Sequence, residues 1–230
     1  EQRAKAADGK GSVEFRAVLQ ETDREIGRLL DALHEMKQDA KTIVIVSGDN
    51  GPEPSFNRAR SGGLRGMKWS LYEGGVRTPL IVRWPGAVPA GVVNDTTIVA
   101  GVDFFPTLCG LANVKVPADA AFDGEDLSAV FRGAKSPRTK PLLWEYGRKP
   151  PSADTKGIRA FPYPREPDAK SPNVAIRDGD WKLLINADGT GAELYNLAND
   201  RNETHSLAAE KPDITQRLTD AALAWRKSLP

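Results

Sequence analysis

The chain has 230 residues, of which 40% are hydrophobic and 27% are charged, a composition typical of a globular protein. Its 32 Lys and Arg residues nearly balance its 31 Asp and Glu residues, so the net charge of +1 favours neither nucleic acid nor an anionic membrane as a partner. No apolar run reaches the roughly 18 residues that a membrane-spanning helix needs, and the single Cys109 excludes an intrachain disulfide.

The first third of the chain alternates a helical pattern with short apolar runs. Apolar residues recur with helical spacing over residues 12–36, which predicts an amphipathic helix. Residues 42–46, TIVIV, form an unbroken β-branched run that predicts a strand buried on both faces of a parallel sheet. A second strand is predicted at 79–84. A helix followed by a buried strand is typical of an α/β fold.

A short helix and a change of character follow. Asp103 is expected near the N-cap of the short helix, with Leu108 and Leu111 facing inward. After residue 133 the chain becomes rich in Pro, Lys and Arg, and we place a domain boundary there, dividing residues 1–140 from residues 141–230.

The second domain is predicted to be a small antiparallel sheet with one packed helix. Beyond a proline-dense loop at 148–172, short apolar runs are joined by turn residues such as those at 178–180. The strands are expected at 174–177, 181–185 and 193–197, and a helix at 212–229 with Ile214, Leu218, Ala221, Ala222 and Trp225 as its buried stripe. The fold class is therefore α/β: part of a mixed, mostly parallel sheet flanked by helices, plus this C-terminal subdomain.

The segment that directly follows the first strand carries a candidate cation site. Asp49 and Asn50 offer a carboxylate and an amide carbonyl, which are hard oxygen ligands suited to Ca²⁺ or Mg²⁺. In open α/β sheets, ligands bind beyond the carboxyl ends of the strands, where these residues are expected. Asp-Asn-Gly is also a common turn sequence, and by themselves these residues favour the plain turn.

A glycine-rich segment at 64–79 carries several cations. Glycines let the backbone approach a ligand closely, and Lys68 is a mobile point charge that can meet a tetrahedral oxyanion. Arg65 and Arg77 can pair with carboxylates or with the ligand. A single loop lysine is otherwise expected to be exposed to solvent.

Several linked motifs resemble the second half of sulfatases of the alkaline-phosphatase superfamily in their order and spacing. They are TIVIVSGDNGP at 42–52, LRGMKWSLYEGGVRTPLIVRWPG at 64–86, DFFPTL at 103–108, DGEDL at 123–127, AIRDGDWKLL at 175–184 and ELYNLANDRNE at 193–203. The resemblance implies that Asp49 and Asn50 are Ca²⁺ ligands, with Mg²⁺ the less favoured ion, and that Lys68 contacts the sulfate of the substrate. Arg65, Glu73 and Arg77 match recurrent motif positions, for which a structural role is expected before a catalytic one.

The chain also departs from the family pattern. Sulfatases of this type use a formylglycine made from a Cys or Ser in a C/S-x-P-x-R motif, whereas Cys109 is followed by Gly-Leu-Ala. The N-terminal Asp-Asp metal ligands and a lysine-histidine pair are likewise absent, and His34 and His205 are expected to face solvent. We therefore expect the formylglycine in upstream sequence, and the N-terminal half of the same protein as a partner of this chain.

The function implied by the resemblance is sulfuric ester hydrolysis by the parent enzyme, with this chain alone inactive. The expected substrate is a sulfate-ester small molecule or a sulfated glycan, with no nucleic-acid or membrane partner. The chain itself indicates no location, and the resemblance implies a periplasmic or secreted one. Two alternatives stay open: a phosphodiester or phosphonate hydrolase of the same superfamily, and a non-catalytic module that binds sulfated glycans.

Overall fold

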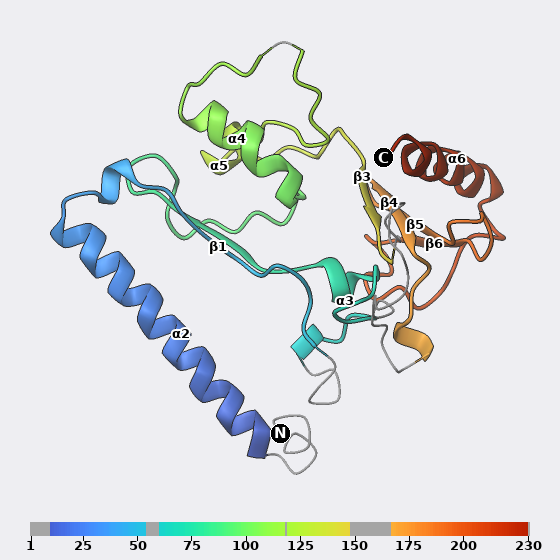
Figure 1. Cartoon of the computed structure of the whole chain (residues 1–230), viewed down its shortest axis with the longest axis horizontal. Helices are drawn as coiled ribbons and strands as arrows, with labels where there is room; N and C mark the ends of the chain where they lie inside the picture. The colour runs from blue at the N-terminus through green and yellow to red at the C-terminus, as the bar shows by residue number, and fades with distance from the viewer. Residues whose placement is uncertain (1–9, 54–59, 118, 148–166, 230) are drawn as a thin grey trace, which may run out of the picture. The chain divides into compact units, whose positions relative to one another are not determined.

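The computed structural model describes residues 10–53, 60–117, 119–147 and 167–229, so most of the expected proline-dense loop lies outside the described residues. The chain divides into two compact units, residues 1–48 with 79–140, and residues 49–78 with 141–230. Figure 1 shows the elements, which are α2 (Lys10–Glu35), η2 (Asp39–Lys41), β1 (Val44–Ser47), α3 (Glu73–Val76), β2 (Leu80–Arg83), η4 (Gly101–Asp103), α4 (Phe104–Leu111), α5 (Ser128–Phe131), β3 (Leu142–Glu145), η5 (Pro167–Ala169), β4 (Val174–Asp178), β5 (Trp181–Ile185), β6 (Glu193–Asn196) and α6 (Pro212–Ser228).

The long helix α2 of the first unit confirms the amphipathic helix expected from the spacing of its apolar residues. A helix of this kind normally buries its apolar stripe against a core. Here Val13, Val18, Leu19 and Leu29 remain 58%, 54%, 51% and 54% exposed. None of the helices in the described ranges is both long and apolar enough to cross a membrane.

Strands β1 and β2 confirm the two apolar runs of the first unit but correct their expected surroundings. They pair antiparallel, with Val44 opposite Arg83 and Ser47 opposite Leu80. Residues 44–46 are half-buried and Ser47 is exposed, so β1 is not buried on both faces of a parallel sheet. A β-branched run favours an extended backbone, but it does not determine the direction of the partner strand.

The short helix α4 begins after Asp103, as expected, although the Asp103 side chain does not cap it. Its carboxylate accepts hydrogen bonds from the backbone amides of Ala100 and Glu125, and it pairs with the buried Arg138. Leu111 is buried, whereas Leu108 is 38% exposed and does not face inward. The carboxylate therefore joins α4 to the segments around it.

The second unit contains the antiparallel sheet expected from the sequence, in the order β3-β4-β5-β6. Strands β4 and β5 are joined by a tight turn in which Gly179 adopts a φ of +59°. Helix α6 begins at Pro212, a position where the missing amide hydrogen is not needed. It buries Leu218 and Ala222, whereas Ala221 is exposed, so the buried stripe is narrower than expected.

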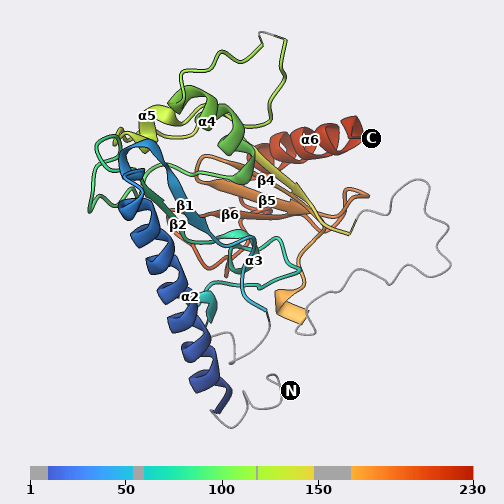
Figure 2. The ribbon, with the colours of Figure 1, turned by 60° about the vertical axis from the view of Figure 1, so that its left-hand side comes forward.

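Both faces of this sheet are covered, because alternate side chains along a strand point to opposite faces. On one face, Leu183 and Ile185 of β5 pack with Leu218 of α6, and Figure 2 shows α6 lying along β4 and β5. On the other face, Leu184 packs with Leu71 and Tyr72, which directly precede α3. The segment that leads into α3 is therefore built into the core of the second unit.

Candidate functional site

The pair Asp49 and Asn50 forms a turn at the start of the second unit. Asp49 Oδ1 accepts hydrogen bonds from the backbone amide and from Nδ2 of Asn50, both at 2.9 Å. Asn50 Nδ2 also donates to the carbonyl oxygen of Gly51 at 3.3 Å. The other two oxygens, Asp49 Oδ2 and Asn50 Oδ1, accept no hydrogen bond from the residues that the structure describes. The turn therefore leaves two oxygen ligands available.

Close packing of glycine backbones holds this turn beside α3. The amide of Gly51 donates to the carbonyl of Gly75 at 2.7 Å. A Cβ atom on Gly51 would lie 1.8 Å from the carbonyl oxygen of Gly74, and one on Gly74 would lie 2.4 Å from that of Gly66. Real side chains do not tolerate such distances, so only glycine allows the three segments to meet.

Lys68 lies next to the same turn. Its backbone amide donates to the carbonyl oxygen of Pro52 at 2.9 Å, which joins the lysine to the residues that follow Asn50. The side chain is half-buried. Its ammonium group forms no ion pair or hydrogen bond with any described residue. The structure thus brings the backbones of the three expected site residues together, and no described side chain compensates the charge of the lysine.

A buried charge cluster fixes the segment that carries Lys68 onto the sheet. Lys182 Nζ lies 2.9 Å from Glu73 Oε1 and 2.9 Å from Glu203 Oε1. Glu203 Oε2 also accepts a hydrogen bond from the amide of Glu73 at 2.6 Å. All three side chains are at most 2% exposed. Because burying a charge is costly unless it is paired, each member of this cluster depends on the others.

The two carboxylates of the cluster respond differently to burial. Burial opposes ionisation of Glu73, but the charges of Lys182, Arg177 and Arg77 outweigh it, and the pKa of Glu73 is lowered. Burial raises the pKa of Glu203, and the shared charge of Lys182 does not compensate for it. Arg177 Nη1 and Arg77 Nη1 lie 3.7 and 3.4 Å from Glu73 Oε2.

A second polar cluster anchors the beginning of the same segment. Arg65 donates to the carbonyl oxygen of Asp168 at 2.8 Å and to the hydroxyl of Tyr195 at 2.8 Å, and its guanidinium lies 3.9 Å from the ring centre of Tyr72. Tyr72 and Tyr195 both donate to the carboxylate of Glu193. Burial and the neighbouring Glu193 raise the pKa of both tyrosines, so they stay neutral donors. Arg65 thus has a structural role.

Sequence reasoning missed Lys182, Glu193 and Glu203 as supports of the site. The signal for Lys182 was its place between Trp181 and Leu183 in an otherwise apolar strand, where a charged residue needs a buried partner. No comparable local signal marks Glu193 or Glu203. The side chains of His34 and His205 are 84% and 74% exposed, and they contact Asp39 and Glu210 respectively.

The donor set fits Ca²⁺ or Mg²⁺ in kind but not in number. Both available oxygens are hard ligands, whereas Ca²⁺ takes about 6 to 8 of them. Within the described ranges, no group of three or more His, Cys, Asp or Glu side chains could hold a metal ion. Asp49 and Asn50 therefore supply part of a coordination shell.

Comparison with protein-family models gives two matches that together cover most of the chain. Residues 15–114 match the model described as "Sulfatase". Residues 67–227 match the model described as "N-sulphoglucosamine sulphohydrolase, C-terminal".

Curated relatives carry related names. A "Sulfatase" of Formosa agariphila is 31% identical over 229 residues, which cover 94% of this chain and 38% of the relative. Human "Arylsulfatase A" is 29% identical, covering 94% of this chain and 44% of the relative. An "N-acetylgalactosamine-6-O-sulfatase" of Bacteroides thetaiotaomicron is 26% identical, with coverage of 88% and 40%. The chain thus spans about two fifths of the length of these relatives.

Solved structures share the fold. Ps i-CgsB, whose structure was also solved in complex with a neocarrahexaose, is similar with a TM-score of 0.67 at 26% identity, covering 88% of this chain and 40% of that one. The PsFucS1 sulfatase of a Pseudoalteromonas species has a TM-score of 0.61 at 25% identity, with coverage of 90% and 41%.

Proposed function

The chain belongs to the sulfatase family, and from this membership we propose that the protein of which it is part hydrolyses sulfate esters, with Lys68 as the residue of this chain that binds the sulfate. The single observation that supports this role is the ammonium group of Lys68, which pairs with no described residue, on a residue whose backbone amide is bound to Pro52 beside the Asp49–Asn50 turn. A lysine placed in this way can stabilise the negative charge that a sulfate oxygen carries in the transition state.

We further propose that Asp49 Oδ2 and Asn50 Oδ1 contribute to a Ca²⁺ site, with Mg²⁺ as the weaker candidate. When bound, the cation would polarise the sulfate oxygens as a Lewis acid. The role of the chain itself is to orient its two oxygens, because the hydrogen bonds to Asp49 Oδ1 fix the carboxylate relative to the amide. The remaining ligands, and a formylglycine nucleophile, are proposed to come from the rest of the protein, since this chain covers only 38% to 44% of its first two relatives.

A sulfated carbohydrate is the substrate class that we propose. Support comes from the relatives: one is named for sulfated N-acetylgalactosamine, and Ps i-CgsB was solved with a bound neocarrahexaose. We also propose, from family membership alone, a periplasmic or secreted location. The near balance of charges in the chain supports the proposal that it has no nucleic-acid or anionic-membrane partner.

Substitution of Lys68 in the full-length protein tests the proposed activity. We expect Lys68→Ala to lower kcat for an aryl sulfate and for sulfated oligosaccharides by about 100- to 1,000-fold, the usual effect of removing one charged group that stabilises the transition state. The exposed Lys227 of α6 provides a matched control, and Lys227→Ala is expected to leave kcat unchanged.

Three results would contradict the proposal in different ways. Equal activity of Lys68→Ala and the wild type would remove Lys68 from the site. Turnover of a phosphodiester or phosphonate in place of a sulfate ester would favour the other hydrolase class of the superfamily. Calorimetry that detects binding of a sulfated oligosaccharide, together with no turnover of any ester, would favour a non-catalytic binding module.

A further inference from the structure

The backbone next to Lys68 is strained. Trp69 adopts a φ of +76°, in the left-handed region that large side chains rarely enter. Residues held in this region cost on the order of 1–3 kcal/mol, and they persist only where the surrounding structure fixes them. Such strain is often found at ligand-binding sites, so the indole ring of Trp69 is a candidate for contact with a ligand.

Contacts on both sides of Trp69 impose this conformation. The amide of Lys68 is bound to the carbonyl of Pro52 at 2.9 Å, and the amide of Ser70 is bound to the carbonyl of Met67 at 3.0 Å. Met67 and Ser70 are buried, with exposed fractions of 1% and 4%. The chain must therefore turn sharply at residue 69. A glycine would make this turn without strain, so the backbone alone gives no reason for a tryptophan.

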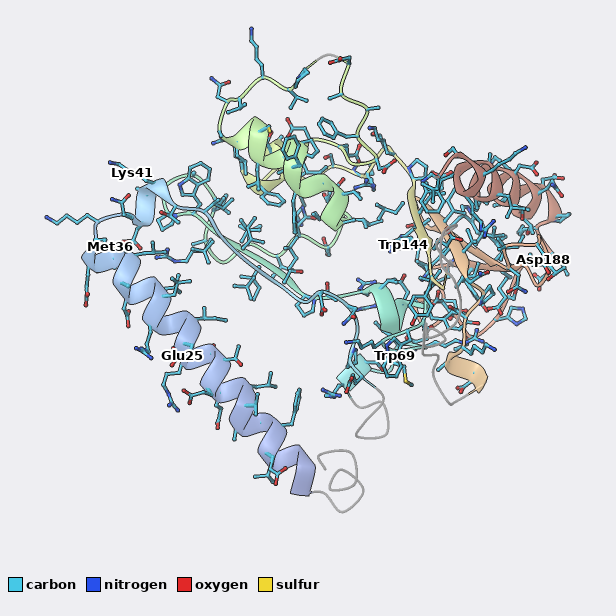
Figure 3. The ribbon with its side chains drawn as sticks, in the orientation of Figure 1. Glu25, Met36, Lys41, Trp69, Trp144 and Asp188 are labelled. Carbon is cyan, nitrogen blue, oxygen red and sulfur yellow. The ribbon has the colours of Figure 1, made fainter. Side chains whose placement is uncertain are left out.

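Packing among the described residues of the second unit does not account for the indole ring either. Trp69 is half-buried, and it belongs neither to the two buried clusters nor to the partly buried residues packed against them. Among the described residues it makes no hydrogen bond, ring contact or cation–π contact, although a tryptophan in a folded protein usually finds a partner for its N–H group. Figure 3 labels Trp69 beside α3, away from the labelled Trp144, which packs against the buried cluster of Leu184 and Tyr195.

We propose that Trp69 contacts the substrate, and that the face of its indole receives the sugar or aryl ring that carries the sulfate ester. This inference rests on the proposed function. The two residues are consecutive, so a sulfate held by the free ammonium of Lys68 places the attached ring within reach of the neighbouring side chain. The strained backbone fixes the indole beside the sulfate site, and the flat apolar face of tryptophan suits a ring better than it suits the anion itself.

Kinetics of Trp69 variants in the full-length protein test this role. Trp69→Gly and Trp69→Asn both accept the left-handed backbone, so we expect a melting temperature no lower than that of the wild type. The KM for a sulfated oligosaccharide is expected to rise roughly tenfold, the upper range for one aromatic contact. Trp69→Phe should recover most of this loss. Inorganic sulfate, which has no ring, serves as the control ligand, and its inhibition constant should stay unchanged.

Each other outcome overturns the inference and identifies what failed. An unchanged KM in Trp69→Gly and Trp69→Asn would show that the indole does not contact the substrate. The proposed function would still stand, provided that the wild type is active. An equal rise in KM and in the inhibition constant of inorganic sulfate would mean that Trp69 only positions Lys68. A wild-type protein without sulfatase activity would overturn the proposed function and this inference together.

Discussion

At the scale of single residues, the buried trio of Glu73, Lys182 and Glu203 decides where the loop of Lys68 lies. One ammonium group serves two carboxylates, and Arg177 and Arg77 also form ion pairs with Glu73. Because Glu203 also accepts the amide of Glu73, the trio fixes the first residue of α3 to the sheet. The position of the loop that carries Lys68 therefore depends on a buried charge cluster.

Removal of Lys182 should be strongly destabilising. Lys182→Met leaves Glu203 and Glu73 buried without their shared cation, and the free energy of unfolding is expected to fall by about 3–5 kcal/mol. Urea titration of the variant and of the wild type measures this difference. Lys227→Met, at an exposed position of α6, is the matched control and should change stability by less than about 0.5 kcal/mol. Equal effects of the two substitutions would show that the buried trio contributes little.

The pH dependence of stability should report on Glu73. Its pKa is lowered in the folded protein, so below its ordinary value of 4.5 the unfolded chain takes up this proton more readily. The stabilisation from Glu73 is thus present above about pH 4.5 and is lost as the pH falls through the folded pKa. Above about pH 4.5 the wild type should therefore have a larger unfolding free energy than Glu73→Gln. This difference should disappear as the pH falls through the folded pKa of Glu73. An advantage that is independent of pH would contradict the assignment.

At the scale of elements, glycines bring the Asp49–Asn50 turn into contact with α3. The carbonyl oxygen of Gly74 occupies the space that a Cβ atom on Gly51 would need, and the hydrogen bond from Gly51 to Gly75 exists only because the two backbones meet. This packing sets the spacing between the Asp49–Asn50 turn and the loop of Lys68.

Gly51→Ala should therefore damage both stability and function. We expect the unfolding free energy to fall by more than about 2 kcal/mol, since two backbone segments must separate, and activity in the full-length protein to fall with it. Gly27→Ala in α2 is the control: apart from its chain neighbours and the backbone of its own helix, nothing lies within 4 Å of its added Cβ, and alanine favours a helix by up to about 1 kcal/mol. If Gly51→Ala and Gly27→Ala both melted at the temperature of the wild type, the close approach of the Gly51 and Gly74 backbones would be disproved.

At the scale of the whole molecule, much apolar surface stays uncovered. Val13, Val18, Leu19 and Leu29 of α2 are all more than half exposed, and Ile81 of β2 is 62% exposed. We expect this chain, expressed by itself, to melt below about 60 °C and to bind a hydrophobic dye. Calorimetry provides the measurement. A sharp cooperative transition above that temperature would show that the exposed apolar residues do not lower the stability of the chain.

The sequence by itself determined most of the helices and strands, and it supplied the candidate site residues. Helical spacing predicted α2 and α6, and apolar runs predicted every strand except β3. Linked motifs singled out Asp49, Asn50 and Lys68 as candidate site residues. These features are local, because the period of a helix or strand and the composition of a motif are contained within a few neighbouring residues.

Only the tertiary structure decided how these parts combine. It set the antiparallel direction of β1 and β2, grouped residues 49–78 with the C-terminal sheet, and paired Glu73 with Lys182 and Glu203. The physical reason is distance along the chain: these partners are separated by 109 and 130 residues, and the packing of the whole unit, not local preference, brings them together.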